Sequence, residues 1–389
     1  MPRYQKINSH ISQMSKGVFT KFASALRAMR GETYPLHIGD TYIEPLLQAR
    51  VESIKSDSHQ GVHRYTFPQG HPDLLQALSA HHAHPVEQTI VSAGATGGIS
   101  AVATATLAPG DEVLILAPYW PLVAGIVKVM RCTPISVPFF DCIQDPDQVV
   151  AYLKQYVSDR TVAVYVNSPN NPTGRVLSND MIKAIADFAG QEDLWIWSDE
   201  VYDRLNFTST HVRIAEYAPE LTIEFHSFSK LYGMAGNRCG YVLLPSSDLM
   251  FGVRKAITHS FYSTPTVAQL AALRALEEGD QWLDSAREAY KKAGDAMADM
   301  LGVQRPDGST FLFLNVADFL DEEGVDGLLL EAIGRNLILA PGSSFGAQYS
   351  DWIRICFTSA PPNMVARGAE ILADILEKRR QRLGEKVLE

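Results

Sequence analysis

Four polar segments of this 389-residue chain each follow directly on a short run of β-forming residues. Each segment holds side chains that can take part in enzyme chemistry, among them lysine, aspartate, asparagine and tryptophan. The segments span residues 117–120, 167–174, 198–202 and 226–230, after runs at 112–116, 161–166, 194–197 and 222–225. Ligands of open parallel sheets bind beyond the carboxyl ends of the strands. We therefore expect the four segments to meet in one crevice.

The residue types in this crevice suit one cofactor, pyridoxal phosphate. Lys230, which lies among small hydroxyl residues, could form a Schiff base with an aldehyde. Asp199 could hold a pyridine nitrogen protonated, and an aromatic residue of the 117–120 segment could cover a flat ring. A helix that starts at residues 94–97 would offer free amides to a phosphate. The protonated ring of pyridoxal phosphate is an electron sink for carbanions, so this set of groups matches it.

An alternation of strands and helices would position these segments. Strand-like runs also occur at 134–137 and 241–244, and segments with a helical pattern, such as 179–189, lie between several of the runs. This alternation indicates an α/β domain with a largely parallel sheet. Residues 248–301 have mostly helical patterns, and a second α/β section follows, with strands expected near 310–315, 337–340 and 353–357.

Three motifs, taken in order, resemble those of one enzyme family. They are Asn167-x-Pro169-x-Asn171-Pro172-Thr173-Gly174, Asp199-Glu200-Val201-Tyr202, and Ser227-Phe228-Ser229-Lys230 with Arg238 eight residues on. The chain resembles a fold-type I, pyridoxal-phosphate-dependent aminotransferase of classes I and II, in the aspartate aminotransferase superfamily, from about residue 34 to 357. The resemblance implies an α/β fold with two domains. A large domain, residues 46–275, would have a mostly parallel seven-stranded sheet with helices on both faces. A smaller α/β domain would combine residues 1–45 and 276–389.

The resemblance also implies how the cofactor is held. Lys230 would be the Schiff-base lysine and the general base and acid, Asp199 the partner of the pyridine nitrogen, and Tyr202 a partner of the ring hydroxyl. These three are the expected catalytic residues. Trp120 would stack on the ring, and Asn171 would also bond the ring hydroxyl. The full set implied to contact the cofactor is Ala95, Thr96, Gly97, Trp120, Asn171, Asp199, Tyr202, Ser227, Ser229, Lys230, Arg238 and, from the neighbouring subunit, Tyr65.

The substrate contacts implied by the resemblance are Gly39, Trp120, Asn171 and Arg354. Arg354 would grip the substrate carboxylate, because a guanidinium fork binds a planar carboxylate through two hydrogen bonds. The match at Tyr65 implies a homodimer with shared active sites. We expect the pocket for the substrate side chain to be lined by residues near Tyr42 and Trp120. The partner subunit would add either the partner's Phe261 or the partner's Tyr262. These aromatic residues favour neutral or aromatic amino acids, and no second arginine for a dicarboxylate can be placed.

The expected activity is amino-group transfer from an L-amino acid to a 2-oxo acid, with ping-pong kinetics. Two alternatives use nearly the same cofactor cup: a C–S β-lyase, and a cyclase like aminocyclopropane-carboxylate synthase. A non-catalytic regulator on this fold is a third possibility, which the presence of Lys230, Asp199 and Arg354 disfavours.

Composition excludes several other classes of protein. The chain has 34 Lys and Arg against 44 Asp and Glu, a formal charge of −10, which disfavours nucleic acid and anionic membranes as partners. No run approaches the roughly 20 apolar residues of a membrane span. Four cysteines without a CxxC pair indicate a reduced, cytoplasmic protein. We predict no metal site, because the tract His81-His82-x-His84 is typical of a helix end before a proline turn.

The first 31 residues contain six basic residues and no acidic one. Such a segment could be a transit peptide. The pattern favours an ordinary amphipathic helix over a transit peptide, because apolar residues recur at spacings of three and four, at positions 11, 14, 18, 22, 26 and 29.

Overall fold

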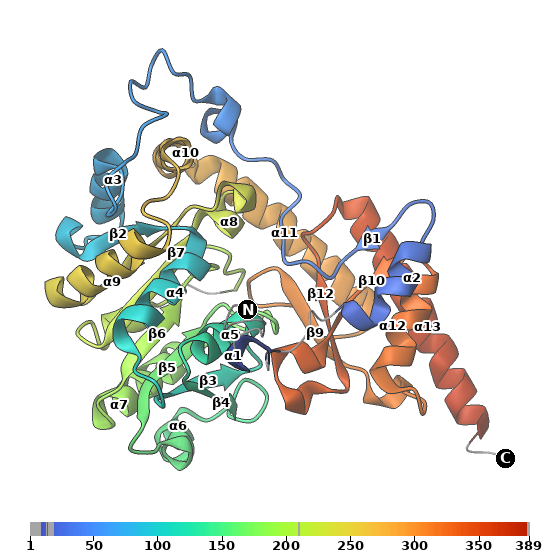
Figure 1. The fold of residues 1–389 in the computed structure, drawn as a ribbon. Helices are drawn as coiled ribbons and strands as arrows, with labels where there is room; N and C mark the ends of the chain where they lie inside the picture. Colours follow the sequence, from blue (N-terminus) through green and yellow to red (C-terminus); the bar gives the residue numbers. More distant parts are fainter. Residues whose placement is uncertain (1–8, 13, 15–18, 209–210, 387–389) are drawn as a thin grey trace, which may run out of the picture.

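The computed structural model describes residues 9–12, 14, 19–208 and 211–386. Its largest element is a seven-stranded sheet (Figure 1). In sheet order the strands are β2 (Thr89–Ser92), β8 (Gly240–Leu243), β7 (Thr222–Ser227), β6 (Trp195–Asp199), β5 (Thr161–Asn167), β3 (Glu112–Ala117) and β4 (Thr133–Pro138). Only β8 runs antiparallel to its neighbours β2 and β7. The expected mostly parallel sheet of seven strands is therefore confirmed.

Helices cover both faces of this sheet, and the alternation of side chains along the strands explains why. On β3, Val113 and Ile115 face one apolar cluster, whereas Leu114 and Leu116 face another. The first cluster lies under α4 (Gly94–Thr106), α5 (Pro121–Val129) and α9 (Ser247–Ser260). The second lies under α6 (Pro146–Leu153) and α7 (Asn179–Gln191). A parallel strand that helices cover on both faces buries all its side chains, so its sequence is a nearly continuous apolar run.

A second, smaller α/β unit lies beside the sheet (Figure 1). Its three antiparallel strands follow the order β11 (Ala340–Pro341), β12 (Trp352–Cys356) and β9 (Phe311–Asn315). Three long helices accompany them: α11 (Asp280–Leu301), α12 (Gly324–Gly334) and α13 (Pro362–Lys386). The short strand β1 (Tyr34–Pro35) pairs in parallel with β10 (Leu337–Ile338). This pairing places residues 34–35 beside residues 337–338, and the predicted two-part small domain with its boundaries stays a prediction.

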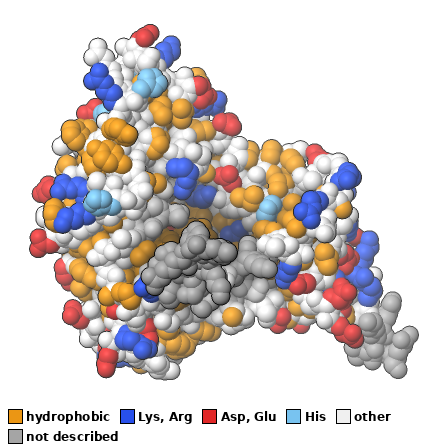
Figure 2. Space-filling view, viewed as in Figure 1, with side chains coloured by type: hydrophobic (Ala, Val, Ile, Leu, Met, Phe, Trp, Pro, Cys, Tyr) orange, Lys and Arg blue, Asp and Glu red, His pale blue; other side chains and the backbone are white. Residues whose placement is uncertain are grey.

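Three more helices complete the described fold around the large sheet. They are α3 (Pro72–His82), α8 (Phe228–Leu231) and α10 (Thr266–Glu278). Short 3₁₀ turns link several of the elements. No helix among the described residues combines the length and the apolar character that crossing a membrane requires. Acidic and basic side chains are intermixed over the described surface that Figure 2 shows.

The N-terminal segment does not form the single amphipathic helix that its spacing predicts. It contains α1 (Ser9–Ser12), a 3₁₀ turn at Thr20–Phe22 and α2 (Ala23–Ala28), and Met14 and Phe19 lie outside these helices. Val18 is outside the described residues. The last of the helices ends because Met29 adopts an extended backbone, with ψ 143°. Three of the periodic apolar residues pack instead into the core, since Phe22 is buried and Leu26 and Met29 lie against it, whereas Ile11 is exposed.

Candidate active site

A cavity of about 380 Å³ opens at the carboxyl ends of β5, β6 and β7, facing β11 and β12. Its size is within the usual range for a small-molecule site. All but two of the predicted site residues line it: Gly39, Ala95, Thr96, Trp120, Asn171, Asp199, Tyr202, Ser227, Ser229, Lys230, Arg238 and Arg354. The fold therefore brings together four polar segments that lie far apart in the sequence.

The first turn of α4 and the side chain of Arg238 form one end of the cavity. Arg238 donates from Nη1 to the carbonyl of Ala235 (2.9 Å) and from Nη2 to that of Ala93 (3.4 Å). It makes no ion pair with a carboxylate among the described residues. Gly94 has φ +68°, and a Cβ there would lie 2.6 Å from Nη2 of Arg238. Only glycine lets the guanidinium lie this close to the helix N-terminus, where free amides favour an anion.

Two serines extend this end of the cavity. Ser227 caps α8: its Oγ accepts the amide of Ser229 (3.1 Å) and donates to Oγ of Ser229 (2.9 Å). Gly97 lies in the first turn of α4 but does not line the cavity, and a Cβ there would be 3.0 Å from Cβ of Ala93.

The carboxylate of Asp199 is buried at the end of β6. The hydroxyl of Tyr165 donates to its Oδ2, and the amide of Val201 lies 3.4 Å from its Oδ1. Burial nevertheless raises the pKa of Asp199 to about 6, and these two hydrogen bonds oppose the rise. No cationic side chain of the described residues is within ion-pair distance of Asp199. A cationic ring nitrogen would therefore be a stabilising partner for it.

Asn167 holds the ends of two strands together at this point. It lies opposite Asp199 in the parallel register of β5 and β6, and its Nδ2 donates to the carbonyl of Asp199 (2.8 Å). Its Oδ1 accepts the amide of Asn171 (2.7 Å). The side chain thereby fixes the loop that carries Asn171 to the strand end that carries Asp199.

The loop after Asn171, which follows a strand of the large sheet, packs against β9 of the small sheet and the residues before it. Gly174 has φ +72°, and a Cβ there would lie 2.5 Å from the carbonyl oxygen of Phe311 on β9. The carbonyl of Gly174 accepts the amides of Asp307 and Gly308, both at 2.9 Å. These contacts explain the glycine that closes the first motif.

The amine of Lys230 points across the cavity and donates to the carbonyl of Gly39. Burial lowers the pKa of Lys230, and the charge of Asp40 opposes that shift. A Cβ on Gly39 would lie 2.7 Å from the ring of Phe311, so a larger residue would be forced against β9. A lysine with a lowered pKa is more readily the neutral amine that attacks a carbonyl.

Arg354 on β12 is 7% exposed and has no carboxylate partner among the described residues. Its Nη1 donates to Oδ1 of Asn171 (3.0 Å) and its Nη2 to the carbonyl of His37 (2.5 Å), whereas its Nε has no partner. The guanidinium lies between the rings of Phe311 (4.3 Å) and Phe345 (4.7 Å). Burial lowers its pKa to about 10, so it is still a cation at neutral pH. A buried cation of this kind calls for an anionic ligand.

Aromatic side chains complete the cavity. Tyr202 is buried with its ring edge-on to Phe311 (6.0 Å), and burial raises its pKa. Trp120 caps the N-terminus of α5, next to Tyr119, whose amide donates to the carbonyl of Phe345 (3.1 Å).

Two predicted aromatic residues lie away from the cavity of their own chain. Tyr65 is 87% exposed and its ring contacts that of Tyr262 (5.1 Å). Tyr42 does not line the cavity: it lies edge-on to Tyr290 (6.2 Å) in the packing beside α11. Gly39, three positions before Tyr42, does line the cavity, and the expected side-chain pocket near Tyr42 stays a prediction.

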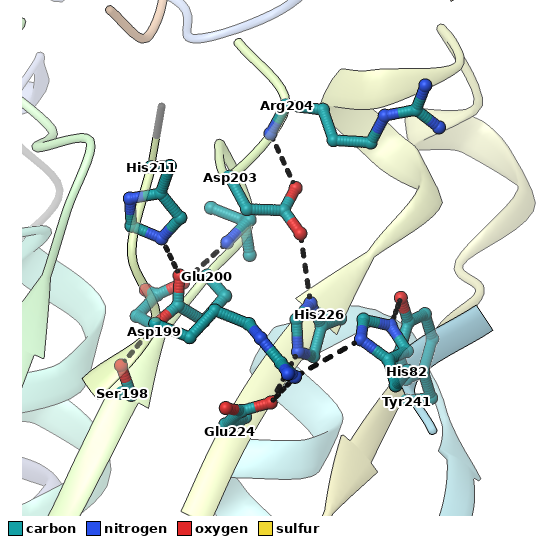
Figure 3. A network of polar contacts seen from close by, with 12 residues as sticks. His82, Ser198, Asp199, Glu200, Asp203, Arg204, His211, Glu224, His226 and Tyr241 are labelled. Atoms are coloured by element: carbon teal, nitrogen blue, oxygen red, sulfur yellow. Dashed lines mark hydrogen bonds and ion pairs between the residues drawn. The ribbon is translucent and has the colours of Figure 1, made fainter. Parts of the chain in front are cut away.

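A buried polar network lies next to the end of β6 (Figure 3). His226 is paired with Asp203 (3.5 Å) and with Glu224 (3.2 Å), and these carboxylates raise its pKa to about 9 although burial opposes the charge. Glu200 accepts from the hydroxyl of Ser198 (2.6 Å) and is paired with His211 (2.5 Å). The network anchors the segment from 198 to 203, which carries Asp199 and Tyr202.

His82, Glu224 and His226 place ligand atoms within 4.8 Å of one another, which is close enough to hold a metal ion. The guanidinium of Arg213 already donates to Oε2 of Glu224 (3.0 Å) and contacts Nδ1 of His82 (3.3 Å). A cation thus occupies the position where a metal would need these atoms. The absence of a metal site stays a prediction.

Sequence reasoning missed Tyr165, Asn167 and His37 as parts of the site. For the first two a signal exists: residues 165 and 167 lie on one face of a strand, because side chains alternate. His37 lies beside Arg354, and burial together with that cation lowers its pKa to about 4. No local pattern marks it.

The arrangement is that of an α/β fold with a cavity suited to a small anionic ligand beyond the carboxyl ends of its parallel strands. Residues 34–372 match the family described as aminotransferase class I and II, and the chain belongs to that family. It is a fold-type I aminotransferase, as the motifs predict.

Relatives and solved structures agree with this assignment. A probable aspartate/prephenate aminotransferase of Thermus aquaticus is 31% identical over 324 residues, 78% of this chain and 82% of the relative. An arginine–pyruvate transaminase of Pseudomonas aeruginosa is 31% identical over 77% of this chain and 82% of its own. A solved aspartate aminotransferase double mutant of Thermus thermophilus superposes with a TM-score of 0.87, at 25% identity, over 96% of this chain and all of that one. Amino-group transfer, and not elimination or cyclisation, is the activity that these relatives support.

Proposed function

We propose that this aminotransferase holds pyridoxal phosphate, the cofactor of its family, in the 380 Å³ cavity and uses it to transfer amino groups between amino acids and 2-oxo acids. The bound cofactor would supply an aldehyde for covalent attachment and a protonated ring that draws electrons from the substrate Cα. Its site would consist of the predicted residues that line the cavity.

The groups of the cavity fit this cofactor at both ends. The amides of Ala95 and Thr96, the hydroxyls of Ser227 and Ser229 and the guanidinium of Arg238 would bind the phosphate. The gap that Gly94 leaves beside Arg238 is the observation that supports an anion there, because a Cβ would fill it.

At the other end, Asp199 would pair with the ring nitrogen, since no cationic side chain of the described residues is within ion-pair distance of its buried carboxylate. Asn171 and Tyr202 would bond the ring hydroxyl, and Trp120 would cover the ring.

Two residues would act on the substrate directly. Lys230 would hold the aldehyde until an amino acid displaces it, and its Nζ would then carry the proton from the substrate Cα. Arg354 would bind the substrate carboxylate and thereby orient Cα toward Lys230. The observation that carries the proposal is the buried guanidinium of Arg354, which has a free Nε and no carboxylate partner among the described residues, in the same cavity as Lys230.

The test compares Lys230→Ala with Lys292→Ala, which removes an exposed lysine of α11. Both variants are purified with added pyridoxal phosphate. We expect Lys230→Ala to lose amino-group transfer and the borohydride-reducible link to the cofactor, while Lys292→Ala keeps both. Full turnover by Lys230→Ala would show that another group carries the chemistry.

A further inference from the structure

We propose that the substrate side chain lies against an apolar wall of this cavity, so that uncharged, apolar L-amino acids are the preferred donors and dicarboxylic ones are poor donors. The inference rests on the proposed function, because Arg354 must hold the Cα carboxylate for the side chain to reach that wall. It goes beyond the names of the relatives, several of which are aspartate aminotransferases.

The wall consists of apolar side chains beside the groups assigned to the cofactor and to the substrate carboxylate. They come from the residue before the 3₁₀ turn at Thr20–Phe22, from α5 and from the 3₁₀ turn at Gly342–Phe345. Those lining the cavity are Phe19, Pro121, Leu122 and Phe345, beside Trp120. Leu122 is 55% exposed although it is a large apolar residue in the first turn of α5. Contact with an apolar substrate group would remove this surface from water.

The charges that line the cavity leave no partner for a second carboxylate. Its cations among the described residues are Lys230, Arg238 and Arg354, and each has a place in the proposed site. His37 also lines the cavity, but burial and the neighbouring Arg354 keep it neutral at physiological pH, with a pKa of about 4. A distal carboxylate would therefore lose water without gaining an ion pair, which is costly.

A basic substrate side chain would likewise find no ion-pair partner among the described residues that line the cavity. Asp199 is the only acid among the described residues that line the cavity, and the ring nitrogen of the cofactor would occupy it.

Two other lysines among the described residues lie in an adjoining hollow. This hollow is lined by Lys21 and Lys128, and it shares Pro121, Leu122 and Ser344 with the cavity. Lys21 is already paired with Asp326. Neither lysine lines the cavity itself, and Leu122 is one of the residues that line both spaces.

The experiment measures the first half-reaction of the cofactor-loaded protein with a panel of donors, by the change in cofactor absorbance. The panel contains L-leucine, L-methionine and L-phenylalanine, L-aspartate and L-glutamate, and L-arginine. We expect the second-order rate constant of this half-reaction to be at least about 10-fold higher for each of the three apolar donors than for the charged ones. A preference for L-aspartate, L-glutamate or L-arginine would overturn the proposal and leave the proposed function intact. If no donor of any class reacts, the proposed function itself fails, and this inference with it.

A charge-introducing variant tests the wall directly. Leu122→Lys places a cation at the apolar wall, and the matched control Leu330→Lys places one at an exposed leucine of α12, 45% exposed. We expect Leu122→Lys to shift the ratio of L-aspartate to L-leucine reactivity by about 10-fold or more toward L-aspartate, and Leu330→Lys to leave it unchanged. An unchanged ratio in Leu122→Lys, in a protein that still binds the cofactor, would contradict the assignment of Leu122 to the substrate side chain.

Discussion

At the scale of single residues, the clearest functional signal is Arg354, which is buried between two phenylalanine rings without a carboxylate partner among the described residues. We predict that Arg354→Lys raises the KM for amino donors and lowers kcat/KM by about 10- to 100-fold, because an ammonium cannot reproduce the two-pronged contact of a guanidinium. Steady-state kinetics with a good donor measure the effect.

The matched control is Arg335→Lys, which changes an arginine paired with Asp374 at the surface (2.6 Å). Its kinetics should equal those of the parent protein. If Arg354→Lys kept its KM, the substrate carboxylate would bind elsewhere.

His226 gives a prediction about stability and pH. Its pKa rises from 6.5 to about 9 between Asp203 and Glu224, so the charged imidazole stabilises the fold fully below pH 6.5, and this stabilisation is lost as the pH rises through about 9. The shift corresponds to about 3 kcal/mol, at about 1.4 kcal/mol per pH unit. We expect His226→Gln to be less stable than the parent at pH 6 and the difference to shrink by pH 9.5, measured by urea unfolding. His63→Gln, in an exposed loop, is the control. A gap between parent and His226→Gln that did not depend on pH would mean that His226 is neutral in the fold.

At the scale of elements, the start of α4 shows how one glycine permits a binding site. We predict that Gly94→Ala weakens pyridoxal phosphate binding by about 10-fold and destabilises the protein by about 1 kcal/mol, because φ +68° is strained for alanine and its Cβ would meet Arg238. Equilibrium dialysis of the cofactor and thermal unfolding measure the two effects. Gly252→Ala, within α9, is the control: its Cβ would meet only Cβ of Ala105 at 3.6 Å, so stability should stay equal or rise. Unchanged cofactor affinity in Gly94→Ala would show that the first turn of α4 does not bind the cofactor phosphate.

Elements with a strong local pattern could be predicted from the sequence, and those that depend on distant contacts could not. The strands β3 to β8 lie within a residue or two of the expected runs, because each is a run rich in β-forming residues bounded by polar loops. The four-residue strand β2 was not expected: it owes its place to pairing with β8, far along the chain. The single strand expected at 337–340 is divided into β10 and β11, which pair with different strands, β1 and β12.

The site follows the same rule. Residues inside contiguous motifs, such as Asn171, Asp199 and Lys230, could be predicted because the motif resembles a known one, and all three line the cavity. Tyr165 shares a strand face with Asn167, but its hydrogen bond to Asp199 could not be predicted, because it depends on which strands are neighbours in the sheet. His37 is a site residue only because residues 36–40 lie along β12, where the carbonyl of His37 accepts from Arg354.

At the scale of the whole molecule, an exposed aromatic cluster remains outside the site. Tyr65 and Phe67 are 87% and 68% exposed, and Tyr262 lies against Tyr65. Exposed apolar clusters of this kind are typical of protein interfaces. We therefore predict a homodimer of the 42.9 kDa chain in which this cluster is covered and Tyr65 reaches the phosphate site of the partner.

Sedimentation velocity checks this prediction through two variants. Phe67→Glu should give a monomer, because a buried carboxylate without a partner opposes association, and should bind the cofactor more weakly. Tyr65→Phe should stay a dimer and lose cofactor affinity only, because it removes a hydroxyl and keeps the ring. Tyr217→Glu, at another exposed aromatic residue (42% exposed), is the control and should remain dimeric. A parent protein that sediments as a monomer with full cofactor affinity would show that each chain completes its own site, and Tyr65 would then have no part in it.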